Sequence, residues 1–137
     1  MIRKEYGWFI LPFVIALCIL LWGYTFTSSE TYEIVEPVKT LDSEIDRLSL
    51  KYFISSSTVR AIARCESSMY GSAINHNTNG TVDKGYLQIN SVHYENMAQL
   101  GLSSDDEWDL LEFGFLLMSK QGLQPWSASR HCWKDKI

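Results

Sequence analysis

Several sequence patterns that indicate a ligand-binding or catalytic site are missing from the 137 residues of this protein. It has no Gly-rich loop of the kind that binds phosphate groups. Its three histidines, His76, His93 and His131, are scattered along the chain and lack the Cys or acidic companions of a zinc site. Ser67 has no His and Asp partners arranged for nucleophilic catalysis. The sequence therefore predicts no metal site, no cofactor and no serine-type nucleophile.

Positive charge is also scarce. The chain has 12 Lys and Arg against 16 Asp and Glu, a formal net charge of −4. Arg3, Lys4 and Glu5 precede the first long apolar run, so the remainder carries 10 basic and 15 acidic side chains, a net −5. Binding to nucleic acid needs clustered positive charge. Nucleic acid is therefore a poor candidate for a partner.

Charged residues are absent from one long stretch, between Tyr6 and Ser29, most of which is filled by the sequence WFILPFVIALCILLWGYTF. About 20 apolar residues suffice to cross the hydrocarbon core of a bilayer. Trp8 lies at one end of the run, and Trp22 and Tyr24 lie at the other, as in the aromatic belts at membrane interfaces. The stretch therefore predicts a single membrane-spanning helix.

The charges that flank this run predict its orientation. Two basic residues precede it and three acidic residues follow it, so the positive-inside rule puts the N-terminus in the cytoplasm. We expect residues 1–27 to form a cytoplasmic tip and an anchor in the cytoplasmic membrane, residues 28–39 a stalk, and residues 40–137 an extracytoplasmic domain. The alternative is a cleaved signal peptide. Against it stand the length of the apolar core and the lack of a small-x-small site before Ser29.

Cysteine is rare, with three residues in all. Cys18 lies inside the apolar run, which leaves Cys65 and Cys132 as a pair in an oxidising compartment. Closing a loop of 67 residues stabilises a fold by about 3–5 kcal/mol. We expect a disulfide between them, and the alternative is that Cys65 is a buried free thiol.

Apolar residues recur at helical spacing in four stretches of the exported part. They predict helices over Leu41–Tyr52, Thr58–Ser68, Ser91–Leu100 and Leu110–Gln121. Thr40 or Asp42 is expected to cap the first helix. Asn79-Gly80 is the strongest hairpin signal in the chain and makes Thr81–Asp83 the returning strand of a very small sheet. The expected fold class is α+β, mainly α, with a small β-hairpin.

Two carboxylates in this pattern, Glu66 and Asp83, are 17 residues apart. Glu66 lies at the end of a predicted helix with apolar neighbours, and burial raises the pKa of a carboxyl group. Asp83 lies beside a turn, where we expect it to be solvated and ionised. A proton donor and an ionised carboxylate are the pair that a retaining glycosidase requires. Taken singly, each has a simpler interpretation, since a helical Glu is usually a solvated charge and an Asp beside a turn usually forms the turn.

Taken together, the two carboxylates belong to a longer pattern that resembles the lysozyme-like superfamily. Its parts are the pair Glu66-Ser67, an Asn-rich turn and the run TVDKGYLQINS at residues 81–91. The Glu-Ser pair and the Gly-x-x-Gln-Ile block that begins at Gly85 resemble the first two motifs of soluble lytic transglycosylase (SLT)-type domains. The 17-residue step from Glu to Asp is similar to animal-type lysozymes too. Small secretion-associated and phage-borne transglycosylases share this mixture.

The resemblance extends from about Leu41 to Trp133, which is most of the exported part, and implies a lysozyme-like domain. It departs from the family at the third motif. There the family commonly has an Asn, near the position that Asp109-Leu110 occupies in this chain.

The resemblance implies an enzyme that cleaves the β-1,4 bond between N-acetylmuramic acid and N-acetylglucosamine in peptidoglycan. We expect a lytic transglycosylase, in which Glu66 is the acid and then the base, and the 6-hydroxyl of the muramic sugar attacks within the same molecule. One alternative is a lysozyme-type muramidase, with Asp83 as the nucleophilic or charge-stabilising carboxylate. Another is a non-catalytic glycan-binding module. Degenerate members of such families lose the Glu, whereas Glu66 and Gln88 are both present here.

The resemblance also implies which residues meet the glycan strand. Ser67 and Gln88 would contact substrate or support Glu66. Tyr86 would line the cleft, and Gly85 would let the backbone approach a sugar closely.

The C-terminal tail PWSAS, followed by His-Cys-Trp, again fits the small bacterial members. Trp126 and Trp133 would either stack on sugars or pack into the core, and we favour the core. The expected partners are peptidoglycan glycan strands, the membrane through the N-terminal helix, and a secretion machine or a virion complex.

Overall fold

The computed structural model describes residues 38–137, so the predicted anchor and most of the predicted stalk lie outside the described residues. Residues 38–137 form one compact unit. Within this unit, no helix has both the length and the apolar character that crossing a bilayer requires.

The first two predicted helices are confirmed. Helix α2 spans Leu41–Tyr52 and begins with a capping box, in which the Thr40 side chain accepts a hydrogen bond from the backbone N–H of Ser43 and the Ser43 side chain accepts one from the N–H of Thr40. Helix α3 spans Ser56–Ser67. It starts two residues before the predicted Thr58, because Ser56 and Ser57 enter the first turn without adding an apolar side chain to the pattern.

The predicted hairpin is confirmed, but the sheet has a third strand. Strands β1 (Ile74–His76), β2 (Val82–Lys84) and β3 (Ile89–Asn90) pair antiparallel in that order. The turn between β1 and β2 has Gly80 at φ +85°, a conformation that glycine adopts without strain. The register places Asp83 opposite Asn75 on one side and opposite Asn90 on the other. Directly paired residues share a face, so their three side chains project together.

The two remaining helices differ in their starts from the prediction. A 3₁₀ turn at Ser91–His93 precedes helix α4, Tyr94–Gln99. Helix α5 spans Glu107–Gln121 and begins after Asp106, whose carboxylate accepts hydrogen bonds from the N–H groups of Trp108 and Asp109. The sequence pattern missed this first turn because its residues are mostly acidic and the apolar run starts only at Leu110.

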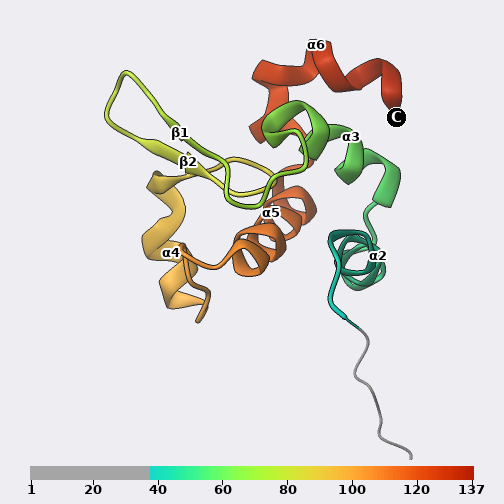
Figure 1. The fold of residues 1–137 in the computed structure, drawn as a ribbon, viewed down its shortest axis with the longest axis horizontal. Coiled ribbons are helices and arrows are strands. Elements are labelled where there is room, and N and C mark those ends of the chain that lie inside the picture. Colours follow the sequence, from blue (N-terminus) through green and yellow to red (C-terminus); the bar gives the residue numbers. More distant parts are fainter. Residues whose placement is uncertain (1–37) are drawn as a thin grey trace, which may run out of the picture. The chain divides into compact units, whose positions relative to one another are not determined.

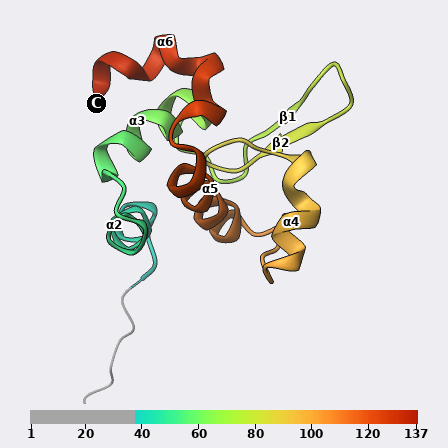
Figure 2. The same ribbon diagram turned by 180° about the vertical axis from the view of Figure 1, so that it is seen from behind.

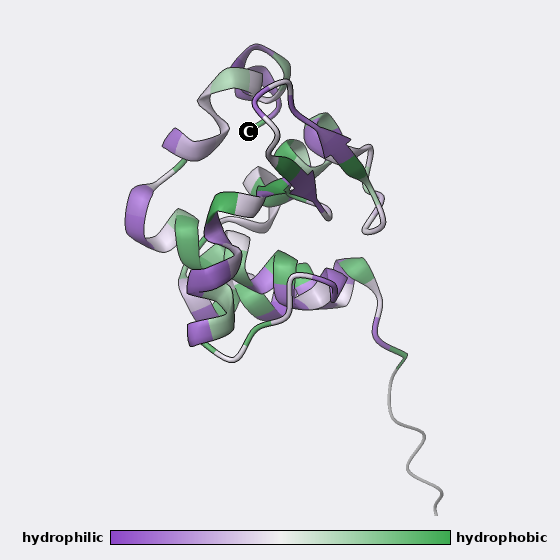
Figure 3. Ribbon diagram, turned by 90° about the vertical axis from the view of Figure 1, so that its left-hand side faces the viewer, coloured by the Kyte–Doolittle hydropathy of each residue, from purple (hydrophilic) through white to green (hydrophobic). Residues whose placement is uncertain are grey.

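Helix α5 lies in the middle of the unit, with the hairpin and α4 to one side and α2 to the other (Figures 1 and 2). Its buried side chains supply much of the core, which Phe113, Phe115 and Leu111 fill without solvent exposure. Gly114 allows the close approach of α5 to the loop after β2, since a Cβ there would lie 2.4 Å from Leu87. Figure 3 shows hydrophobic residues gathered on the helices, whereas the hairpin strands are largely hydrophilic.

The C-terminal tail returns over the end of α3 as three short segments. They are a 3₁₀ segment at Gln124–Ser129, helix α6 at Arg130–Trp133 and a 3₁₀ turn at Lys134–Lys136. Cys65 in α3 and Cys132 in α6 form the expected disulfide. Trp126 and Trp133 are both buried, so each packs into the core as we favoured.

The disulfide closes a loop of 67 residues, which limits the freedom of the unfolded chain. We therefore expect Cys65→Ser combined with Cys132→Ser to lower the free energy of unfolding by about 3–5 kcal/mol. Urea denaturation followed by circular dichroism measures this difference. Wild-type protein in reducing agent should unfold at the same lowered midpoint, and an unchanged midpoint in the double variant would contradict the prediction.

Candidate active site

Glu66 occupies the last turn of α3, beneath the returning C-terminal tail. Its side chain is partly buried, because the 3₁₀ segment at Gln124–Ser129 packs against this end of the helix. Burial raises the pKa of the Glu66 carboxyl above its ordinary value of 4.5. A hydrogen bond from Ser129 acts in the opposite direction, and the negative charge of Asp83 raises the pKa further. Glu66 is thus a carboxyl group that retains its proton to higher pH than an exposed glutamate.

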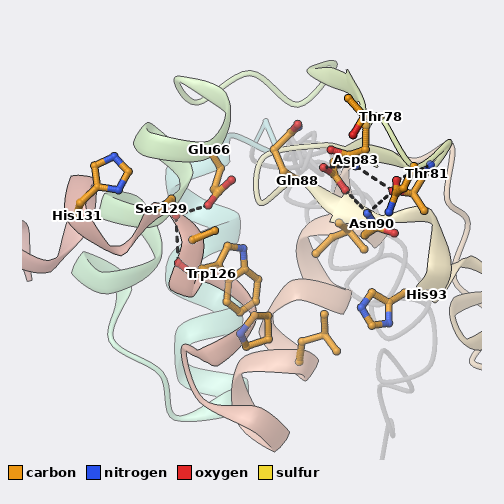
Figure 4. A pocket seen from close by; sticks show the side chains of 16 residues that line it. Glu66, Thr78, Thr81, Asp83, Gln88, Asn90, His93, Trp126, Ser129 and His131 are labelled. Carbon is orange, nitrogen blue, oxygen red and sulfur yellow. Dashed lines mark hydrogen bonds between the residues drawn. The ribbon is translucent and has the colours of Figure 1, made fainter.

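Ser129 is a neighbour of Glu66 that the sequence did not predict. Its Oγ donates a hydrogen bond of 2.5 Å to Oε1 of Glu66 (Figure 4). The indole N–H of Trp133 donates in turn to Oγ of Ser129 at 3.1 Å. One signal for this contact was present in the sequence. The expected disulfide joins the neighbour of Glu66, Cys65, to a residue three positions from Ser129.

Asp83 lies in β2 and is held by amide groups from both neighbouring strands. Asn90 donates to its Oδ1 at 2.6 Å, and Asn77 donates to its Oδ2 at 2.8 Å, with Asn75 at a longer 3.5 Å from the same oxygen. Because the amide nitrogens donate, the carboxylate acts as the acceptor in all three contacts. We expected a solvated carboxylate, and the structure instead shows a partly buried one inside an amide cradle.

Glu66 and Asp83 line the same cleft, which has a volume of about 730 Å³. Figure 4 shows them projecting into it from different sides, Glu66 from α3 and Asp83 from the sheet. A cleft of this size falls in the usual range for small-ligand sites. Its other walls are mostly polar and come from the hairpin, the β3–α4 region, helix α5 and the C-terminal tail: Asn77, Thr78, Asn79, Thr81, Gln88, Ile89, Asn90, His93, Leu117, Pro125, Trp126, Ala128, Ser129 and His131.

Gln88 and Trp126 also line the cleft. The side-chain nitrogen of Gln88 donates to the carbonyl oxygens of Gly85 at 2.9 Å and Ala73 at 3.2 Å. These bonds tie the loop after β2 to the start of β1. Trp126 donates from its indole N–H to the carbonyl of Leu87 at 2.8 Å. Since it is only 5% exposed, Trp126 presents little of its ring to the cleft.

Three other residues predicted to meet substrate are not among those that line the cleft. Ser67 is buried, and its hydroxyl lies within hydrogen-bond distance of the carbonyl oxygens of Ala63, at 3.0 Å, and Tyr86, at 2.9 Å. Ser67 therefore ties α3 to the loop after β2, which fits support of Glu66 better than contact with a sugar.

Tyr86 and Gly85 also contribute to packing. Tyr86 packs against Trp108, and burial beside the charge of Glu107 raises its pKa to about 12. Gly85 has φ +81°, and a Cβ there would lie 3.1 Å from Leu110. Gly85 therefore lets the backbone approach helix α5 closely, whereas the sequence led us to expect a close approach to a sugar.

Comparison with known proteins gives a partial match. No family model matches the chain. The protein IpgF of Shigella flexneri is 40% identical over 60 residues, which cover 44% of this chain and 40% of that protein. The invasion protein IagB of Salmonella typhimurium is 44% identical over 50 residues, which cover 36% of this chain and 31% of that protein. The matched part thus spans less than half the length of these curated relatives.

The raised pKa of Glu66 should make the stability of the folded protein depend on pH. Its pKa is raised in the folded state, so between the unfolded and folded values the native protein holds more protons than the unfolded chain. The free energy of unfolding must therefore fall as pH rises through that window. Glu66→Gln carries no charge at any pH, so we expect a higher Tm than wild type at pH 7. This difference should shrink as pH falls through the raised pKa toward 4.5 and change no further below that value.

Differential scanning calorimetry across pH tests this. Glu95→Gln, which removes an exposed carboxylate from α4, is the matched control and should track the wild type. A Glu66→Gln variant that melts below wild type at pH 7 would show that the buried charge costs nothing.

Proposed function

We propose that this domain is a lytic transglycosylase that cleaves the β-1,4 bond between N-acetylmuramic acid and N-acetylglucosamine in peptidoglycan. The observation that carries this proposal is the Glu66 carboxyl, partly buried on the wall of a polar cleft with its pKa raised by that burial. Cleavage of a glycosidic bond near neutral pH needs such a proton donor beside the leaving oxygen. The partial sequence similarity to the bacterial proteins IpgF and IagB also supports the proposal.

Each step of the reaction can be assigned to Glu66. Its carboxyl proton passes to the glycosidic oxygen as the bond from that oxygen to the anomeric carbon of the muramic sugar breaks. Glu66, now a carboxylate, accepts the proton of the 6-hydroxyl of the same sugar as its oxygen attacks the anomeric carbon. The product is a 1,6-anhydro sugar, and Glu66 regains its proton. The Asp83 carboxylate, in the same cleft, would stabilise the positive charge that develops on the sugar ring.

A second candidate is hydrolysis by a lysozyme-type mechanism, and the amide cradle of Asp83 favours it. Asn77 and Asn90 hold the two carboxylate oxygens separately, which fixes the group in the cleft that Glu66 also lines. A carboxylate fixed in this way suits a nucleophile or a charge stabiliser in a retaining glycosidase. Water would then complete the reaction and leave a reducing end.

A glycan-binding module without activity is the third alternative. Binding alone does not require a carboxyl group with a raised pKa. A buried charge also lowers the stability of the fold, so it is retained where it serves a function. The environment of Glu66 therefore supports an enzyme over a binding module.

We also propose that the enzyme acts close to the membrane, where its cleavage of peptidoglycan makes room for a secretion machine. The apolar run at residues 8–26 would anchor it, and a 12-residue stalk at 28–39 would reach at most ~40 Å when extended. This tether would confine cleavage to peptidoglycan near the bilayer. Partial similarity to a bacterial protein named for invasion favours a bacterial machine over a virion as the partner.

Glu66→Gln should lower peptidoglycan cleavage by at least about a hundredfold, because the amide has no proton to donate. A zymogram with embedded cell wall and the release of soluble muropeptides measure this. Glu95→Gln, on the exposed face of α4, should retain wild-type activity. Equal, slow solubilisation by wild type and Glu66→Gln would favour the binding module.

Asp83→Asn separates the two chemistries. A transglycosylase should keep activity within about tenfold of wild type, whereas a retaining hydrolase loses its nucleophile and falls by three or more orders of magnitude. Mass spectrometry of the products gives an independent answer, because 1,6-anhydro ends differ from reducing ends by one water. Asp135→Asn, an exposed change near the C-terminus, is the control.

A further inference from the structure

We propose that Ser129 is a positioning residue that holds Oε1 of Glu66 and leaves the other oxygen, Oε2, to exchange the proton with substrate. The inference rests on the proposed function of Glu66 and names a residue that this function does not require. Two observations carry it: a chain of hydrogen bonds that ends on Oε1, and a covalent link that fixes the two ends of that chain together.

The chain of hydrogen bonds has a defined direction. The indole N–H of Trp133 can only donate, so Oγ of Ser129 is the acceptor in their 3.1 Å contact. The single hydroxyl proton of Ser129 is then free to be donated, and Oε1 of Glu66 lies 2.5 Å away. The Trp133 N–H also lies 3.2 Å from the carbonyl oxygen of Trp126, so it is shared between two acceptors and leaves the Ser129 proton for the carboxyl group.

A second acceptor allows this contact to survive the reaction. The carbonyl oxygen of Trp126 lies 3.2 Å from Oγ of Ser129. When Glu66 is a carboxylate, the Ser129 hydroxyl donates to Oε1. If a proton occupies Oε1, the hydroxyl can turn to the Trp126 carbonyl and accept from Glu66 instead. Ser129 can therefore hold the carboxyl group in both protonation states that an acid and then a base must adopt.

The disulfide places both ends of this chain. Cys65 precedes Glu66 in α3, and Cys132 lies between Ser129 and Trp133 in the tail. The bond between the two sulfur atoms thus fixes the tail against the end of α3 at the point where Ser129 meets Glu66. A rotamer held in this way gives a defined geometry for proton transfer, which governs the rate of such steps.

The Ser129 hydrogen bond favours the charged form of Glu66, so its removal has a predictable sign. In Ser129→Ala we therefore expect the pKa of Glu66 to rise further. The basic limb of the kcat/KM profile should move to higher pH with it. At the optimum, kcat should fall by about ten- to a hundredfold with little change in KM, because the freed carboxyl samples unproductive rotamers.

The experiment uses the full chain in detergent micelles, with ¹³C-labelled glutamate. Nuclear magnetic resonance follows the Glu66 carboxyl signal, assigned by its loss in Glu66→Gln, while parallel assays record muropeptide release against pH. Ser129→Thr keeps a hydroxyl and should restore both the pKa and the rate toward wild type. Ser127→Ala, an exposed change in the same 3₁₀ segment, should alter neither. Trp133→Phe keeps the buried ring but removes the N–H, and should give a smaller shift in the same direction.

The outcomes separate this proposal from the one on which it rests. A Glu66 titration in Ser129→Ala that matches Ser127→Ala would overturn the role of Ser129, whatever the activity. If Ser129→Ala does not fold, an unshifted titration in folded Trp133→Phe would overturn it equally. If the Glu66 pKa rises in Ser129→Ala as predicted but the wild-type chain cleaves no peptidoglycan, the role of Ser129 stands and the proposed function is overturned.

Discussion

The arrangement of this domain depends on the partial burial of one carboxyl group at the end of α3. Burial disfavours the charged form of Glu66, and this raises its pKa. Such burial requires that something cover a helix end that would otherwise face water. The C-terminal tail supplies the cover, and the disulfide between Cys65 and Cys132 fixes it there. Stability and chemistry are therefore coupled at one place.

The opposite wall of the cleft follows a different principle. Asp83 is stabilised by the side-chain amides of Asn77 and Asn90, and the register of the small sheet brings Asn90 beside it. A short sheet has little core of its own, and Gln88 compensates by tying the loop after β2 to the start of β1. Two carboxyl groups thus meet one cleft, one beneath a packed tail and the other in an amide cradle. This contrast is the physical basis of the proposed division of roles.

Much of the local structure was predictable because its causes are local. The capping box at Thr40, the helical spacing of apolar residues and the Asn79-Gly80 turn each act within a few residues. The start of α5 was missed, since an Asp cap followed by acidic residues gives no apolar period to detect. The third strand was missed because two residues are too few for a pattern.

The sequence by itself determined the helices, the hairpin, the pairing of two cysteines and the suspicion that Glu66 has a raised pKa, all from neighbours along the chain. Only the tertiary structure decided which side chains face the cleft. Ser67, Gly85 and Tyr86 belong to the same sequence pattern as Glu66 and Gln88. However, the Ser67 hydroxyl bonds to backbone, Gly85 lies against α5, and the Tyr86 ring packs against Trp108. Ser129 approaches Glu66 from 63 residues away, a separation that local pattern does not bridge and the packed tail does.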